Sequence, residues 1–233
     1  MLYRHGSYRT GYAILLIPAL LTLAFVAVAR VAFPVPSRLE QAGRRTAHGK
    51  RFARAYWIYM LAAACFGAGL MSFEFVSYHL SSRGIVTEQW IPIFLAISTG
   101  MGVVASLVLG RLYDRIGLPV VLAGVLLCSL FSPLVFLGGF TAALAGLILW
   151  GIGYATQDTL LKAVVAGMLP EGRRNLAFGL FYTGYGAGWL VGSIATGLLY
   201  DRSIPAVIAF AVIVQLTSLP LFMMAGRMRR HAD

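Results

Sequence analysis

The sequence predicts an all-helical membrane protein that crosses the bilayer several times. Of its 233 residues, 59% are hydrophobic and only 12% are charged, and the mean hydropathy is +0.81. The apolar residues gather in runs of roughly 20, which is the length that a helix needs to cross the hydrocarbon core. The charged residues lie mainly in the gaps between these runs. Composition and spacing together exclude an ordinary soluble domain.

Seven apolar runs are long enough to be spans. They cover residues 11–33, 55–79, 91–109, 119–138, 141–168, 176–199 and 204–225. The one long gap is polar and basic, and we expect a cytoplasmic linker there. The chain then divides into an outer segment with one span (1–33), the linker (34–54) and a six-helix bundle (55–233).

The distribution of lysine and arginine predicts the orientation, because cytoplasmic loops carry an excess of both. With the linker placed inside, thirteen of the 19 basic residues fall in inside segments and four in outside segments. This asymmetry predicts a multi-pass protein of the inner membrane, with its amino terminus outside and its carboxyl terminus in the cytoplasm. Because the positive charges are confined to loops, they argue against a nucleic-acid partner.

A short charged segment between two apolar runs, Gly110 to Gly117, reads G-R-L-Y-D-R-I-G. Its terminal glycines predict a tight turn at the membrane surface. Asp114 and Arg115 are placed to pair with neighbouring helix ends. We therefore expect Gly110, Asp114, Arg115 and Gly117 to form a structural or gating turn.

The core of this segment, G-x-L-Y-D-R, recurs 87 residues later, where it ends in Asp201 and Arg202. A motif repeated at equivalent places favours an internal repeat, here of three spans. The segment resembles the G-x-x-x-D-R-x-G loop signature of the major facilitator superfamily of secondary transporters. It departs from that signature at Leu118 and Pro119, where family members usually continue with basic residues.

The resemblance implies two six-span halves joined by a cytoplasmic linker, each half built as a 3+3 inverted repeat. The chain resembles the sixth span of such a protein, the linker and the whole second half, and so is interpreted as a fragment or shortened product. The implied function is secondary active transport of a small solute by alternating access, with a proton as one candidate coupling ion. A missing first half or a second copy of the chain would complete the pathway.

Polar and ionisable residues within spans are costly, so they are candidates for lining that pathway. The fifth span resembles the pathway-lining tenth span of the family. Structural alternatives remain open: Glu74 as an interfacial carboxylate, Asp158 as the partner of Lys162, Arg111 or Arg115, and the tyrosines as packing residues. The substrate-pathway candidates are Glu74, Tyr78, Tyr154, Gln157, Asp158, Tyr182 and Tyr185.

Glycines predict two further features of the spans. Gly67 and Gly69 are expected to soften the second span. On the sixth span, Gly184, Gly188 and Gly192 recur at four-residue spacing, a pattern that lets two helix backbones approach closely.

Enzyme chemistry has little support in the sequence. There is no H-E-x-x-H, no G-x-S-x-G and no Cys/His cluster, so we predict no catalytic residue, metal or cofactor. Two other classes compete with a transporter. One is a non-transporting membrane fragment or interaction protein that needs a partner bundle, and the weaker one is a seven-span receptor-like protein or intramembrane enzyme.

Overall fold

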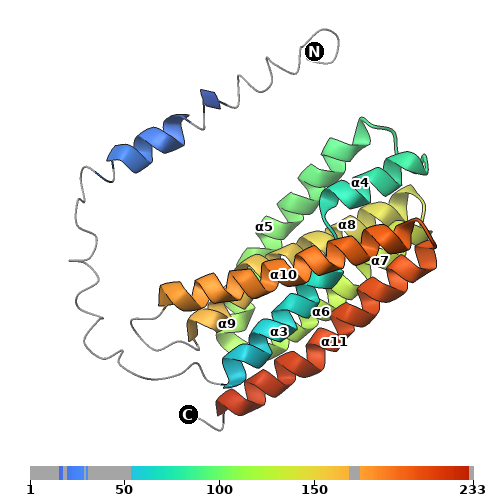
Figure 1. Cartoon of the computed structure of the whole chain (residues 1–233). Helices are drawn as coiled ribbons and strands as arrows, with labels where there is room; N and C mark the ends of the chain where they lie inside the picture. The colour runs from blue at the N-terminus through green and yellow to red at the C-terminus, as the bar shows by residue number, and fades with distance from the viewer. Residues whose placement is uncertain (1–15, 18–19, 29, 31–53, 168–173, 231–233) are drawn as a thin grey trace. The chain divides into compact units, whose positions relative to one another are not determined.

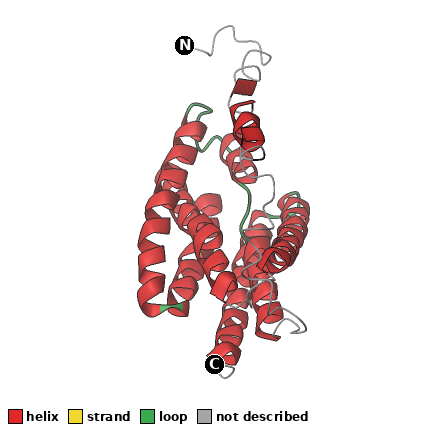
Figure 2. Cartoon of the chain, turned by 90° about the vertical axis from the view of Figure 1, so that its left-hand side faces the viewer, coloured by secondary structure: helices red, strands yellow, loops and turns green. Residues whose placement is uncertain are grey.

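The computed structural model describes residues 16–17, 20–28, 30, 54–167 and 174–230. No β-strand occurs among these residues, which confirms the predicted all-α class (Figure 2). The chain divides into two units, 1–48 and 49–233. In the first unit residues 20–28 are helical, while most of the predicted first span and linker lies outside the described residues.

The second unit is a bundle of helices that lie side by side (Figure 1). Its segments are α3 (Arg54–Gly69), α4 (Phe73–Ser82), α5 (Trp90–Ile116), α6 (Leu118–Ser129), α7 (Phe131–Leu137), α8 (Phe140–Ala155), the π-helical η2 (Thr156–Leu161), α9 (Lys162–Gly167), α10 (Arg174–Tyr200) and α11 (Ile204–Arg230).

Five stretches of the described residues are long and apolar enough to cross a membrane: Arg54–Ser82, Trp90–Ile116, Leu118–Leu137, Phe140–Ala166 and Ile204–Arg229. The predicted span 176–199 lies in α10, which has 27 residues but is not among these five stretches. A polytopic membrane protein is confirmed, and the total of seven spans stays a prediction.

The helices pack in an exchanged pattern. Helix α3 packs against α10 and α11, whereas α8 packs against α5, α6 and α7. If α3–α7 and α8–α11 are taken as two three-span units within the bundle, the first helix of each three-span unit packs against the later helices of the other. This exchange agrees with two equivalent three-span units.

The glycine row of α10 explains how closely it approaches α3. A side-chain carbon at Gly188 would collide with the carbonyl of Ala64, and one at Gly192 with the carbonyl of Ala68. At Gly184 such a carbon would come within 2.8 Å of Met60. The predicted packing role of this row is confirmed.

An equivalent contact joins α5 and α8. Gly151 of α8 lies against the backbone carbonyl of Ser98, and a side-chain carbon at Gly102 would lie 3.2 Å from the Gly151 carbonyl oxygen. The two three-span units thus share one kind of packing contact, in which a glycine lets two helix backbones touch, at equivalent helix pairs.

The prediction of a tight turn across residues 110–117 is wrong in its extent. Helix α5 continues through Gly110 as far as Ile116, and the turn is confined to Gly117, whose φ is 69°. A helix can project beyond its apolar run because its backbone groups are satisfied internally. Arg115, in the last turn, is favoured there by the helix dipole. The second copy behaves alike: α10 runs to Tyr200 before the chain turns.

Candidate functional site

The predicted span 55–79 is interrupted. Helix α3 ends at Gly69, and Ser72 starts α4, its Oγ accepting a hydrogen bond from the Phe75 N–H at 3.4 Å. Gly69 is required by a close approach, because a side-chain carbon there would lie 2.8 Å from the carbonyl oxygen of Ala211 in α11. The interruption therefore follows the expected softening of this helix by glycine.

A tryptophan of α8, in the other three-span unit, supports this break. The indole Nε1 of Trp150 donates a hydrogen bond of 2.8 Å to the carbonyl oxygen of Met71. Without a partner, a carbonyl in a lipid environment costs on the order of a few kcal/mol. The Trp150 ring is stacked on Tyr154 at 5.4 Å between centroids, and Phe73 lies 6.2 Å away.

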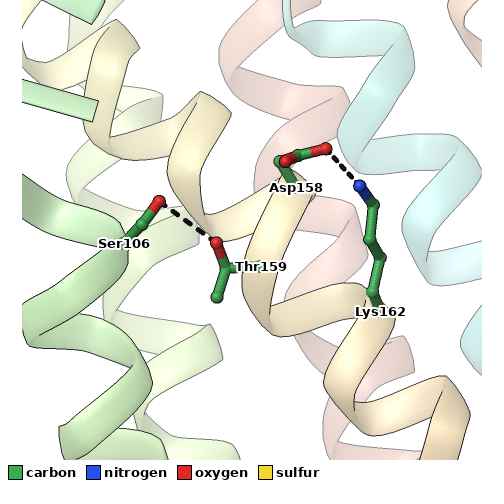
Figure 3. A network of polar contacts seen from close by, with 4 residues as sticks. All are labelled: Ser106, Asp158, Thr159 and Lys162. Carbon is green, nitrogen blue, oxygen red and sulfur yellow. Dashed lines mark hydrogen bonds and ion pairs between the residues drawn. The ribbon is translucent and has the colours of Figure 1, made fainter. Parts of the chain in front are cut away.

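The predicted span 141–168 is interrupted in a different way. After α8 the chain forms one π-helical segment, η2, and then returns to an α-helix in α9. Such π-helical segments occur frequently at functional sites. Thr159 of η2 donates a hydrogen bond of 3.1 Å to the Ser106 hydroxyl of α5, and Asp158 forms an ion pair with Lys162 (Figure 3). The Lys162 ammonium lies 5.9 Å from the ring centroid of Tyr182.

A cavity of about 450 Å³ lies between the two interruptions. The α3–α4 break, α5, the α8–η2 segment and α10 all contribute to its wall. Trp150, Tyr154, Phe73 and Trp189 give the wall an aromatic character. The remaining lining residues are Leu70, Met71, Ser72, Glu74, Leu95, Ser98, Thr99, Gly102, Val103, Ser106, Gly151, Ala155 and Asp158.

The cavity has an acidic character. Its two ionisable carboxylates belong to Glu74 and Asp158, and no Lys, Arg or His is among its lining residues. Asp158 is paired with Lys162, whereas Glu74 is exposed and has no cationic partner in the part of the chain that the structure describes. A ligand in this cavity would meet aromatic rings, hydroxyl groups and one unpaired negative charge.

Three of the seven predicted pathway residues, Glu74, Tyr154 and Asp158, come together in this cavity. Gln157 is adjacent in sequence but does not line it, and its buried Oε1 has no hydrogen-bond partner. Tyr182 contacts Lys162 through the face of its ring.

The other two predicted pathway residues lie elsewhere. Tyr185 is 4% exposed and lies against Gly67, where a side-chain carbon would come within 2.7 Å of its ring. Tyr78 is exposed near the end of α4, and its ring centroid lies 5.9 Å from that of Tyr200. Both are aromatic packing partners in this structure.

The predicted turn residues lie in the last two turns of α5 or directly after α5 and α10. Asp114 and Gly117 line a cavity of about 640 Å³ together with Arg227 and Arg229. Arg202 lines a different cavity, of about 530 Å³. The other three predicted turn residues, Gly110, Arg115 and Asp201, are not among the residues that line these cavities.

Sequence reasoning missed the polar wall on α5. Ser98, Gly102 and Ser106 recur at four-residue spacing and therefore share one helix face. That spacing was a readable signal. The role of Trp150 had no such signal, because its N–H partner is a carbonyl freed by a break 79 residues earlier in the sequence.

Comparison with known proteins agrees with this architecture. The sequence profile described as Major Facilitator Superfamily matches residues 95–232. An uncharacterized protein of Mycobacterium tuberculosis is 29% identical over 177 residues, which cover 76% of this chain and 43% of the relative. An uncharacterized MFS-type transporter of Methanocaldococcus jannaschii is 24% identical over 50% of this chain and 30% of its own length.

A third relative is the uncharacterized MFS-type transporter YwoD of Bacillus subtilis, 30% identical over 61% of this chain and 31% of its own length. The chain thus spans less than half the length of the relatives that it matches. The profile match covers more than half of the chain and falls on the helices that build the bundle. The chain belongs to the major facilitator superfamily.

Proposed function

We propose that the cavity between the two interrupted helices is the wall that this chain contributes to a substrate pathway, in a transporter driven by a gradient through alternating access. One observation carries the proposal: residues 70–72 of the first break and Asp158 of the second line the same 450 Å³ space. Each break follows 16 helical residues, or about 24 Å of helix, so each lies within a bilayer of about 30 Å but past its midplane, toward the side to which its helix runs. Discontinuous helices that meet within the bilayer are a common way to build a transport site.

The chemistry of this wall favours a small organic cation with an apolar body. Aromatic faces attract cations through the ring quadrupole, and Trp150 and Tyr154 present such faces. The unpaired carboxylate of Glu74 supplies the compensating charge. A proton is the candidate coupling ion, because Glu74 can carry either a proton or a cationic substrate.

Transport requires a second bundle. Tyr154 and Tyr182 are 43% and 46% exposed in this chain, and Asp158 is also exposed. Facing lipid, each unpaired polar group would cost on the order of a few kcal/mol. A separately made first half or a second copy of the chain would cover this face, and the isolated monomer would not transport. The same exposure favours the second candidate function, a non-transporting membrane partner of another bundle.

Reconstitution separates these alternatives. Proteoliposomes would contain either this chain alone or this chain joined to the five preceding spans of a full-length member of the superfamily, and uptake of labelled phenyltrimethylammonium would be measured with and without a proton gradient. We expect gradient-dependent uptake from the joined protein, loss of uptake in its Glu74→Gln variant, and none from the chain alone. Uptake by a monomeric chain contradicts the two-bundle proposal. No uptake by the joined protein, once shown to be folded, contradicts cation transport.

The orientation is tested independently. We propose that the carboxyl terminus is cytoplasmic and that residue 82 is outside. After replacement of Cys65 and Cys128, a cysteine at Ser82 should react with an impermeant thiol reagent in intact cells, and one at Asp233 should react only after lysis. The reverse pattern would invert the orientation.

A further inference from the structure

A second cavity, of about 530 Å³, lies at the end of the bundle where α4 ends and α11 begins. Its volume is within the range of small-molecule sites. Two arginines line it, Arg83 after α4 and Arg202 in the turn between α10 and α11. They come from different three-span units, so the cavity closes only when the two units pack together.

The charge of this cavity is uncompensated. No Asp or Glu lines it. Within the described residues neither guanidinium forms an ion pair, although Asp201 is the sequence neighbour of Arg202. Helix α11 begins at the cavity with Ile204 and has 27 residues, so its amino-terminal dipole adds positive potential there. Each of these features favours a negatively charged occupant.

A buried histidine supplies an unused hydrogen-bonding group. His79 lines the cavity and is 2% exposed, and its ring lies 4.5 Å from that of Phe136. Its Nδ1 lies 3.0 Å from the Tyr200 hydroxyl, whereas its Nε2 is buried without a partner. When Nδ1 accepts a hydrogen bond from the Tyr200 hydroxyl, Nε2 carries the ring proton and can donate a hydrogen bond to an anion. A buried ring nitrogen without a partner is costly, and a bound acceptor would remove that cost.

We infer that His79, Arg83 and Arg202 form a binding site for a phosphate group. The guanidinium fork matches the oxygens of a phosphate, and a neutral imidazole N–H adds a donor from the buried side of the cavity. Loops that join membrane-spanning helices lie at the level of the lipid headgroups, where phosphate is abundant. The phosphate can come from an anionic lipid or from solution. The site lies apart from the cavity assigned to transport and does not depend on that assignment.

The inference also gives Arg202 a role that differs from that of its counterpart Arg115. Both occupy the last position of the repeated G-x-L-Y-D-R core. Arg202 lines this cavity together with His79, whereas Arg115 does not line it. The two copies of the motif therefore have different consequences at the two ends of the bundle.

The test uses the purified full chain in detergent micelles and follows its melting temperature by tryptophan fluorescence. One arm adds inorganic phosphate against chloride at constant ionic strength, and the other adds phosphatidylglycerol against phosphatidylcholine. We expect saturable stabilisation in at least one arm. Stabilisation by phosphatidylglycerol alone identifies a lipid headgroup, and stabilisation by inorganic phosphate alone identifies a soluble anion. No stabilisation in either arm overturns the inference.

Variants identify the residues. Losing one charged hydrogen-bonding partner should weaken binding roughly tenfold, so Arg83→Gln and Arg202→Gln should each shift the half-saturating concentration by about that factor. Arg54→Gln is the matched control, because Arg54 is also exposed and lies at the opposite end of the stretch Arg54–Ser82. Equal weakening in the control, or none in either cavity variant, contradicts the assignment. If a variant does not fold, the unaltered chain still decides the question, by equilibrium dialysis of radioactive phosphate and by gel filtration with labelled phosphatidylglycerol. If neither ligand binds one-to-one, the inference is overturned.

Discussion

The two interrupted helices begin alike and break differently. Helix α3 and helix α8 each run for 16 residues before the interruption. In the first, residues 70–72 leave the helix altogether, and α4 starts afresh from a serine cap. In the second, the chain stays helical and widens into the single π-helical segment η2.

The two breaks also differ in how many hydrogen bonds support them. The Met71 carbonyl at the first break receives its hydrogen bond from Trp150, a residue of the other unit. The second break has several supports: the Thr156 hydroxyl and the Thr156 N–H both donate to the Ile152 carbonyl, Thr159 donates to the Ser106 hydroxyl of α5, and the Leu161 carbonyl accepts a hydrogen bond of 3.3 Å from the Tyr59 hydroxyl of α3. Loss of the Trp150 hydrogen bond should therefore disturb the α3–α4 break, while the π-helical segment should be less sensitive to the loss of any single hydrogen bond.

The largest expected loss of stability tests whether α3 and α8 both depend on a backbone contact at glycine. Gly192→Ala should disturb the contact of α10 with α3, and Gly151→Ala the contact of α8 with α5, since each new methyl group meets a backbone carbonyl. We expect each change to destabilise the chain by about 2–3 kcal/mol. The measurement is the melting temperature of the purified chain in detergent.

Gly186→Ala is the matched control, because a side-chain carbon at Gly186 meets no atom within 4 Å. It should raise stability by up to about 1 kcal/mol through helix propensity. If only one of the variants Gly151→Ala and Gly192→Ala lowers stability, the two three-span units do not share this packing contact.

The next effect concerns the first break itself. Trp150→Phe keeps a ring but removes the donor to the Met71 carbonyl, and should cost about 1–2 kcal/mol because the carbonyl is left unpaired. Hydrogen exchange should rise at residues 70–75. Trp189→Phe, at a second tryptophan of the same cavity, serves as the control for loss of an indole. Equal effects of the two variants would refute the support of the break by Trp150.

A smaller effect is expected at the second break. Thr156→Val is close to isosteric and removes a hydroxyl whose acceptor keeps a backbone partner. Thr156 is fully buried, so the loss should be measurable but only about 0.5 kcal/mol. A cost as large as that of Trp150→Phe would show that the π-helical segment depends on this hydroxyl.

The smallest effect is expected at the Asp158–Lys162 ion pair. The two side chains are 58% and 36% exposed. An exposed pair at four-residue spacing contributes about 0.3–0.5 kcal/mol, and Asp158→Asn should lower stability by no more than that. Chemical denaturation in micelles measures it. A loss above about 1 kcal/mol would assign Asp158 a structural role instead of a place in the pathway wall.

Much of this architecture is readable from the sequence. Apolar run length predicts the helices, and the four-residue spacing of Gly184, Gly188 and Gly192 predicts a backbone contact that the structure contains. Asp158 and Lys162 share a helix face by spacing alone, and they pair. These features depend on local periodicity, which a sequence displays directly.

The features that depend on distant partners were not predictable. Helix α3 ends after Gly69 because α11 approaches closely there and because Trp150 compensates the freed carbonyl, and neither partner is near in sequence. Tyr185 is polar enough to suggest a pathway residue, yet it fills the space left by Gly67. The charges at 110–117 predict a turn there because charge marks where a span leaves the lipid, whereas the helix itself continues to Ile116.

We attribute the preference of the shared cavity for cations to Glu74, and binding of a cation to the chain tests this most directly. The measurement is quenching of tryptophan fluorescence in the purified chain by tetraphenylphosphonium, with the similarly shaped anion tetraphenylborate as the control for partition into micelles. We predict saturable binding of the cation alone, weakened roughly tenfold in Glu74→Gln and unchanged in Asp201→Asn. Equal binding of both ions, or a Glu74→Gln variant that binds the cation as tightly as the unaltered chain, would contradict it.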